Sequence, residues 1–184
     1  MRPLLLSFLV LFGLSRTLAA TVILPAEFRE IVSGSQLIVH GRVVDLRSEW
    51  VEGRSRIDTF VTIEAATFYR GSPAPTITFR TPGGEVGHHK SIIVGAPQFR
   101  VGDEAVLFLK TDSLAGPQIF GLNQGLFRVR VDPRTGRRLV VRHVLVSQGS
   151  GSERVMRGDR DRRPLTLDAF GALVRSTLQQ EPAR

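Results

Sequence analysis

His88 and His89 are the residues that most directly suggest metal chemistry, because imidazole nitrogen is a common zinc ligand. In a strand the two side chains would point to opposite faces, so they could share one ion only within a loop. His40 and His143 lie far away in the sequence, and no H-E-x-x-H motif is present. We therefore expect hydrogen-bonded or solvent-facing histidines, and no metal or other cofactor.

Other catalytic signatures are absent from the sequence. There is no G-x-S-x-G elbow, no Walker loop and no cysteine to act as a nucleophile or form a disulfide. The acidic pairs Asp103-Glu104 and Asp159/Asp161 fall in a predicted turn and a predicted linker, which favours a turn former and solvated charges over a catalytic dyad. We expect a non-enzymatic protein; a small hydrolase with dispersed, unrecognised site residues is one alternative.

The N-terminus is typical of a secretory signal peptide. Arg2 precedes an apolar run from Leu4 to Leu14, and small residues follow at 19–20. The run is short for a bilayer span, so we expect residues 1–20 to be removed and the remainder to have no stable membrane span. An uncleaved anchor is the alternative. The expected location is periplasmic or extracellular.

The net charge of +8 comes almost entirely from arginine, since Lys90 and Lys110 are the only lysines. A basic surface attracts anionic polymers. Residues 148–163 are rich in Gly, Ser and charge, which predicts a flexible basic linker. An anionic envelope glycan or lipid is therefore an alternative partner, and nucleic acid is not expected for an exported chain with only 7% aromatic residues. The candidate polyanion-binding residues are Arg154, Arg157, Arg160, Arg162 and Arg163.

The hydrophobic pattern predicts one mainly β domain over residues 21–147, with a helix before and after the strands. The first helix is predicted at 25–33 and ends at Gly34, and the second lies within 164–180, begins after Thr166 and packs on the strands. A slip in alternation at Val44 predicts a bulge or bend, and the apolar run 104–109 predicts a buried central strand. The predicted strands are 36–50, 57–69, 76–80, 88–95, 104–109, 118–122, 125–132 and 138–146.

Four segments follow one another in an order seen in exported bacterial proteins: "EFREIVSGSQLIVHGRVVDL", "FVTIEAATFYRGS", "TITFRTPGG" and "FRVGDEAVLFL". This layout resembles the netrin-like variety of OB-fold found in the tissue inhibitors of metalloproteinases. The resemblance covers roughly residues 26–110 and implies an antiparallel OB-like (netrin-like) barrel. Those inhibitors chelate the protease zinc through an N-terminal disulfide-bonded cysteine, which this chain lacks.

Loops at the rim of such a barrel are the expected contact surface for an exported protein partner, because rigid strands hold them in place. A secreted metalloprotease is the class of partner that the resemblance implies. Trp50 is the preferred anchor, since tryptophan is enriched at interface hot spots, although packing on its own domain is the alternative. The candidate rim residues are Trp50, Gly83, Gly84, His88, His89 and Pro97.

Export can be tested on the chain itself. We expect the protein recovered from the cell envelope to begin near Ala20 or Thr21, which intact-mass measurement will detect. Loss of the first segment removes Arg2 and Arg16 and lowers the net charge from +8 to +6. A soluble cytoplasmic protein that retains Met1 would contradict the expectation.

Overall fold

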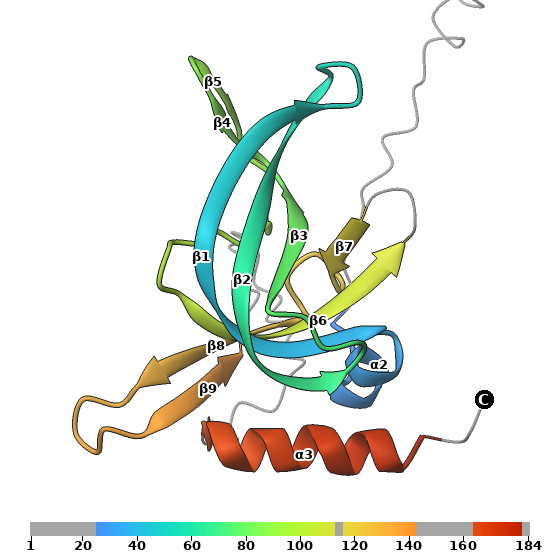
Figure 1. Cartoon of the computed structure of the whole chain (residues 1–184), viewed down its shortest axis with the longest axis vertical. Helices are drawn as coiled ribbons and strands as arrows, with labels where there is room; N and C mark the ends of the chain where they lie inside the picture. Colours follow the sequence, from blue (N-terminus) through green and yellow to red (C-terminus); the bar gives the residue numbers. More distant parts are fainter. Residues whose placement is uncertain (1–24, 113–115, 143–163, 182–184) are drawn as a thin grey trace, which may run out of the picture.

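The computed structural model describes residues 25–112, 116–142 and 164–181 and is mainly β, with a large mixed sheet and a C-terminal helix (Figure 1). The predicted signal segment and basic linker, including its five arginines, lie outside the described residues. The elements are α2 (Phe28–Ser33), β1 (Leu37–Val51), β2 (Arg56–Arg70), β3 (Thr76–Pro82), β4 (Gly84–Val86), β5 (His89–Ser91), β6 (Glu104–Asp112), β7 (Gly116–Ile119), β8 (Leu126–Val131), β9 (Arg138–Arg142), β10 (Leu165–Thr166) and α3 (Leu167–Gln179).

The large sheet has the order β1-β2-β3-β7-β6-β8-β9-β10, and β1 also pairs with β6. The pairings from β1 through β2, β3, β7 and β6 therefore lead back to β1. An odd number of strands cannot alternate in direction all the way round such a ring. One pair must be parallel, and it is β3–β7, which meets at Arg80 and Gln118. The prediction of a purely antiparallel sheet was wrong for this reason.

The bulge predicted at Val44 is confirmed. The register between β1 and β2 shifts between Val43 and Asp45, so Val44 has no partner on β2. The displaced backbone is held by the turn before β6: Val43 N–H donates to the carbonyl of Asp103 at 2.8 Å, and Gly102 N–H donates to the carbonyl of Val43 at 2.8 Å. Gly102 has a φ of 91°, which suits glycine. The turn before β6, which is not part of the β1–β2 hairpin, therefore stabilises the bend in β1.

β6 is the shared wall between two cores. Its residues from Ala105 to Leu109 are all buried, which confirms the prediction of a central strand. Leu107 and Leu109 face one core, which we call the ring core, and Phe108 faces the other, the helix-side core. This alternation is the one that a strand imposes on successive side chains. The buried ring core consists of Leu37, Val39, Val43, Val61, Ile63, Phe79, Ala105, Leu107, Leu109, Ile119 and Leu126.

The helix-side core is closed by α2 and α3. Phe28 of α2 packs edge-on against Phe108, Phe127 and Phe170, at centroid distances of 5.9, 5.9 and 5.7 Å. The prediction that this helix packs on the strands is confirmed, because the apolar stripe of α3, Leu167, Phe170 and Val174, is buried in this core. The helix also begins after Thr166 as predicted, and Thr166 Oγ1 caps it by accepting a hydrogen bond from Ala169 N–H at 3.3 Å.

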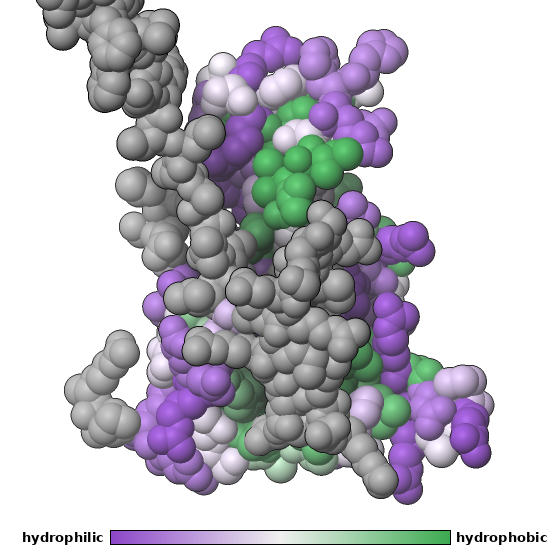
Figure 2. All heavy atoms as spheres, turned by 180° about the vertical axis from the view of Figure 1, so that it is seen from behind, coloured by the Kyte–Doolittle hydropathy of each residue, from purple (hydrophilic) through white to green (hydrophobic). Residues whose placement is uncertain are grey.

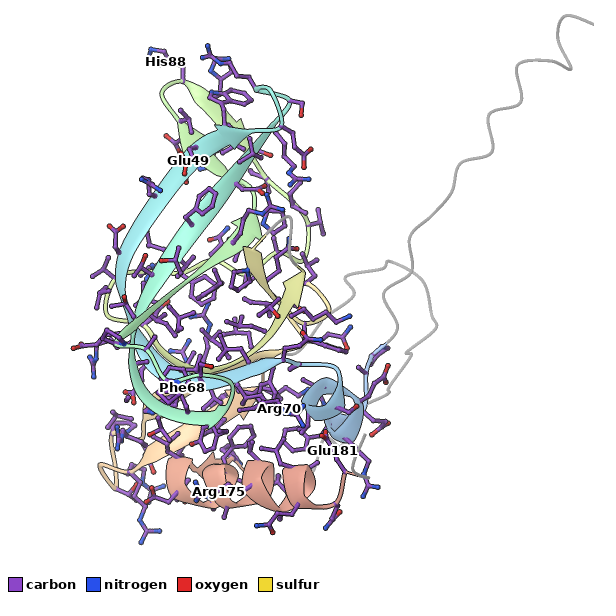
Figure 3. All side chains as sticks on the ribbon, turned by 45° about the vertical axis from the view of Figure 1, so that its right-hand side comes forward. Glu49, Phe68, Arg70, His88, Arg175 and Glu181 are labelled. Atoms are coloured by element: carbon purple, nitrogen blue, oxygen red, sulfur yellow. The ribbon has the colours of Figure 1, made fainter. Side chains whose placement is uncertain are left out.

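Arg70 fastens the end of β2 to both helical segments. Its guanidinium donates to the carbonyls of Val32 and Ser35 at 2.8 and 2.9 Å, and it pairs with the carboxylate of Glu181 just after α3. Figure 3 shows Arg70 and Glu181 lying beside one another between α2 and the end of α3.

Three local predictions need correction. The predicted strands leave out residues 84–86, but these residues form β4, which pairs with β5, and the strand predicted over 88–95 covers only His89–Ser91. β7 ends at Ile119, short of the predicted 118–122, because the chain turns at Gly121 and Leu122, which have positive φ values of 57° and 67°. Alternation within the predicted strand 125–132 would bury Val131 together with Phe127, but Val131 is 61% exposed because β8 has left the core by that point.

The shared wall makes a quantitative prediction. Replacing Leu107, which is fully buried, with alanine should lower the free energy of unfolding by about 2–5 kcal/mol, the range for a core leucine. Chemical denaturation will measure the loss. The matched control is Leu165→Ala in β10, where the leucine is 38% exposed and the expected loss is about 1 kcal/mol or less. Equal losses in the two variants would show that β6 is not a central strand.

Candidate functional site

The structure brings Trp50 and His89 together. Trp50 lies near the end of β1, opposite Ile57 of β2, and His89 begins β5. Their ring centroids are 5.3 Å apart, with the planes inclined at 69°, an edge-to-face contact. Trp50 is partly exposed, and His89 is exposed. Two of the predicted rim residues therefore share one surface, although they are 39 positions apart in the sequence.

The glycine pair positions this contact. Gly83 N–H donates to the carbonyl of Ile57 at 2.9 Å, and the carbonyl of Gly83 accepts from Thr59 Oγ1 at 2.7 Å. A Cβ on Gly84 would lie 2.5 Å from both Ser48 Oγ and Thr59 Oγ1. Only glycine therefore lets the chain cross so closely over β1 and β2. Gly83 is buried, so it does not contact a partner directly. The role of Gly83 and Gly84 is to set the position of the β4–β5 hairpin over β1 and β2.

The two remaining rim candidates lie in different surroundings. His88 is exposed in the turn between β4 and β5 and lies at the outer end of the molecule (Figure 3). Pro97 is buried, so its ring offers no surface to a partner. The loop that contains Pro97 continues to Phe99, whose ring packs edge-on against Phe79 at 5.4 Å. Pro97 is therefore part of the packing beneath the loop.

A run of exposed apolar residues directly follows the β4–β5 hairpin. The sequence predicted these residues as part of the strand 88–95. Ile92, Ile93 and Val94 are 71%, 39% and 93% exposed directly after β5. Figure 2 shows an exposed hydrophobic area on the upper half of the face turned away in Figure 1. We call Trp50, His89, Ile92, Ile93 and Val94 the apical patch. A run of three exposed branched residues is unusual for a surface with no partner.

A buried carboxylate supports the apical patch from below. Asp58 alternates with the buried Ile57 along β2, which would leave it facing solvent, but it is 1% exposed. Its carboxylate accepts hydrogen bonds from Arg56 Nε at 3.0 Å and pairs with Arg80 Nε at 3.1 Å. The hydrogen bond that Arg56 donates to Asp58 is the main cause of the raised pKa of Arg56, so this guanidinium stays charged. Two arginines thus compensate the burial of one carboxylate and join β2 to β3.

A second polar cluster surrounds His40, which is 5% exposed. Its Nε2 lies 2.7 Å from Glu104 Oε1, and the same oxygen accepts from Arg138 at 3.0 Å. Arg42 lies 3.7 Å from the other carboxylate oxygen. The Glu104 side chain is only 13% exposed, and Glu104 is the first residue of β6 rather than part of the turn in which the pair Asp103-Glu104 was predicted. The signal in the sequence was a histidine inside the apolar run "LIVHG", which required a partner.

Two shallow hollows meet at this cluster, and both are lined by His40 and Arg138. The first, of about 230 Å³, is also lined by Tyr69 and Arg175, and the second, of about 270 Å³, by Glu64. Burial raises the pKa of the Tyr69 phenol, and the Arg175 guanidinium, 5.7 Å from its ring centroid, partly opposes this shift. A carboxylate that orients an imidazole is a general-base arrangement, but here the carboxylate also binds two arginines. The cluster joins β1, β6 and β9 electrostatically.

Among the residues that the structure describes, no three His, Asp or Glu side chains are grouped to hold a metal ion. None of the described helices is long and apolar enough to cross a membrane.

A scan of protein-family models and searches of curated proteins and of solved structures found no match to this chain.

The importance of Glu104 can be measured. Glu104→Ala leaves the imidazole of His40 buried without its carboxylate, so the free energy of unfolding should fall by about 1–3 kcal/mol. For a chain of this size the melting temperature should drop by about 2–4 °C per kcal/mol. The matched control is Glu85→Ala, which removes an exposed carboxylate 3.6 Å from Lys90 and should change stability by less than about 1 kcal/mol. Similar melting of the two variants would contradict the role assigned to Glu104.

Proposed function

We propose that this chain is an exported, non-enzymatic protein-binding module built on an OB-like (netrin-like) barrel. The barrel assignment is supported by the ring of pairings β1-β2-β3-β7-β6-β1 and by its single parallel pair, β3–β7. The export assignment is supported by the apolar N-terminal segment that follows Arg2.

One observation carries the binding assignment: the apical patch combines a partly exposed tryptophan with three exposed branched residues. Exposed apolar surface that persists in a folded monomer marks interaction sites, because leaving it in water is unfavourable. Trp50 offers a large rigid contact area, and Val94 is the most exposed residue of the patch. The proposed partner is a protein that is itself exported.

The scaffold suits this role because it is rigid up to its tip. The β1–β2 ladder continues to the pair Val51–Arg56, so Trp50 is held by both neighbouring strands. The β4–β5 hairpin is fastened to that ladder through Gly83 and Thr59. Little conformational entropy is lost when such loops dock. A secreted metalloprotease is the partner class to test first, on the resemblance of the sequence layout alone.

Two variants test the proposal. Trp50→Ala should weaken capture of the native envelope partner by about 30-fold, the effect of losing a 2 kcal/mol hot spot. Val94→Ser should also weaken capture while leaving the melting temperature unchanged, because Val94 is 93% exposed. Quantitative pull-down with the purified chain, together with thermal melting, provides both measurements.

The matched control is Val101→Ser, which changes a valine that is 65% exposed outside the apical patch and should leave capture unchanged. Equal loss in Val94→Ser and Val101→Ser would sink the assignment of the patch. If Trp50→Ala instead lowers the melting temperature by several degrees, Trp50 is a packing residue. Recovery of no protein by a well-folded wild-type chain would favour the hydrolase alternative, for which the His40–Glu104 pair is the site to examine.

A further inference from the structure

The β8–β9 hairpin, residues 126–142, contains six arginines and one acidic residue, Asp132. Three of the arginines have partners within the fold. Arg128 pairs with Asp103 at 2.8 Å, Arg138 with Glu104 at 3.0 Å, and Arg142 donates to the carbonyl of Ala26 at 2.9 Å.

The other three, Arg130, Arg134 and Arg137, are exposed, and their guanidinium groups pair with no carboxylate among the described residues. The hairpin therefore exposes three positive charges that form no ion pair within the described part of the chain.

The only nearby carboxylate of the hairpin is occupied in shaping the loop. Asp132 accepts hydrogen bonds from Arg134 N–H at 2.9 Å and from Thr135 Oγ1 at 2.7 Å. Its own N–H donates to the carbonyl of Arg137, and its carbonyl accepts from Gly136 N–H. The hydrogen bond from Thr135 is the main cause of the lowered pKa of Asp132. These hydrogen bonds fix the turn that carries Arg134 and Arg137, and Arg130 lies just before it in β8.

We propose that this hairpin is a binding surface for an anionic polysaccharide, independent of the apical patch. Arginine recognises sulfate and carboxylate groups through paired N–H donors. In Figure 1 the loop between β8 and β9 projects beyond the rest of the sheet, so a long chain can pass across it without colliding with the body of the protein. The three arginines line neither of the hollows around His40, which favours an extended ligand over a small one.

The chemistry of the hairpin argues against two other anionic partners. Single-stranded nucleic acid is held by stacking on exposed aromatic rings, but the one aromatic residue here, Phe127, is 4% exposed and buried in the helix-side core. A membrane surface is engaged by inserting tryptophan, phenylalanine or leucine beside the basic residues. The loop "DPRTGR" has none of these.

The test measures binding of a heparin oligosaccharide, as a sulfated polysaccharide probe, to the full chain at several salt concentrations. The variant Arg130→Gln/Arg134→Gln/Arg137→Gln should bind about tenfold or more weakly at low salt. The slope of log affinity against log salt should become shallower by about one unit for each arginine–sulfate pair that the substitutions remove. Arg138 is left unchanged so that its pairing with Glu104 is preserved.

The matched control is Arg47→Gln/Arg54→Gln/Lys90→Gln, which removes three exposed positive charges near the apical patch instead. It should keep its affinity within about threefold, because the charges removed lie away from the hairpin. Equal weakening in both variants would show that only net charge matters and would overturn the proposal. So would absence of heparin binding by the wild-type chain, or tighter binding to phosphatidylglycerol vesicles or to DNA. Since the test uses no protein partner, failure of the apical patch would not affect it.

Discussion

The pairing of β1 with β6 is the constraint on which the rest of the structure depends. It runs from Leu37–Leu109 to Arg42–Glu104 and joins the first strand to one that follows 53 residues after β1 ends. This pairing completes the ring through β2, β3 and β7, and it makes β6 the wall between two cores. A strand buried on both faces must be apolar at every position, which is why the segment "AVLFL" has no polar residue.

The same pairing also explains the polar cluster at the edge of the cores. Arg42 and His40 lie opposite Glu104 and Val106, so the register places a histidine and an arginine beside one carboxylate. The cluster marks the point where β1 leaves β6: beyond Arg42, the strand bulges at Val44 and turns away with β2 alone. The Gly102–Asp103 turn holds the bulge by two backbone hydrogen bonds. The long β1–β2 hairpin can therefore carry Trp50 far from the cores without losing its direction.

The local features of the fold could be predicted from the sequence because short-range chemistry fixes them. The bulge, the cap at Thr166, the stripe of α3 and the two faces of β6 each follow from the pattern of a few neighbouring residues. The parallel pair β3–β7 could not be predicted, because it is a property of the whole ring. The sequence also could not show which arginines pair with the buried carboxylates, because most of these pairs form between different strands. Glu104 and Asp58 look like surface residues in sequence, and only the register shows that each has two arginines within reach.

The two proposed binding surfaces differ in the kind of side chain that they expose to solvent. At the apical end the buried carboxylate of Asp58 is compensated by Arg56 and Arg80, and the exposed residues include the apolar Ile92, Ile93 and Val94. At the β8–β9 hairpin Phe127 and Val129 are buried in the helix-side core, and the exposed residues include Arg130, Arg134 and Arg137. The first surface therefore offers exposed apolar contacts, and the second offers exposed positive charge. Because the ring core includes no residue of the apical patch and none of the three arginines, a change at one surface should leave the other intact.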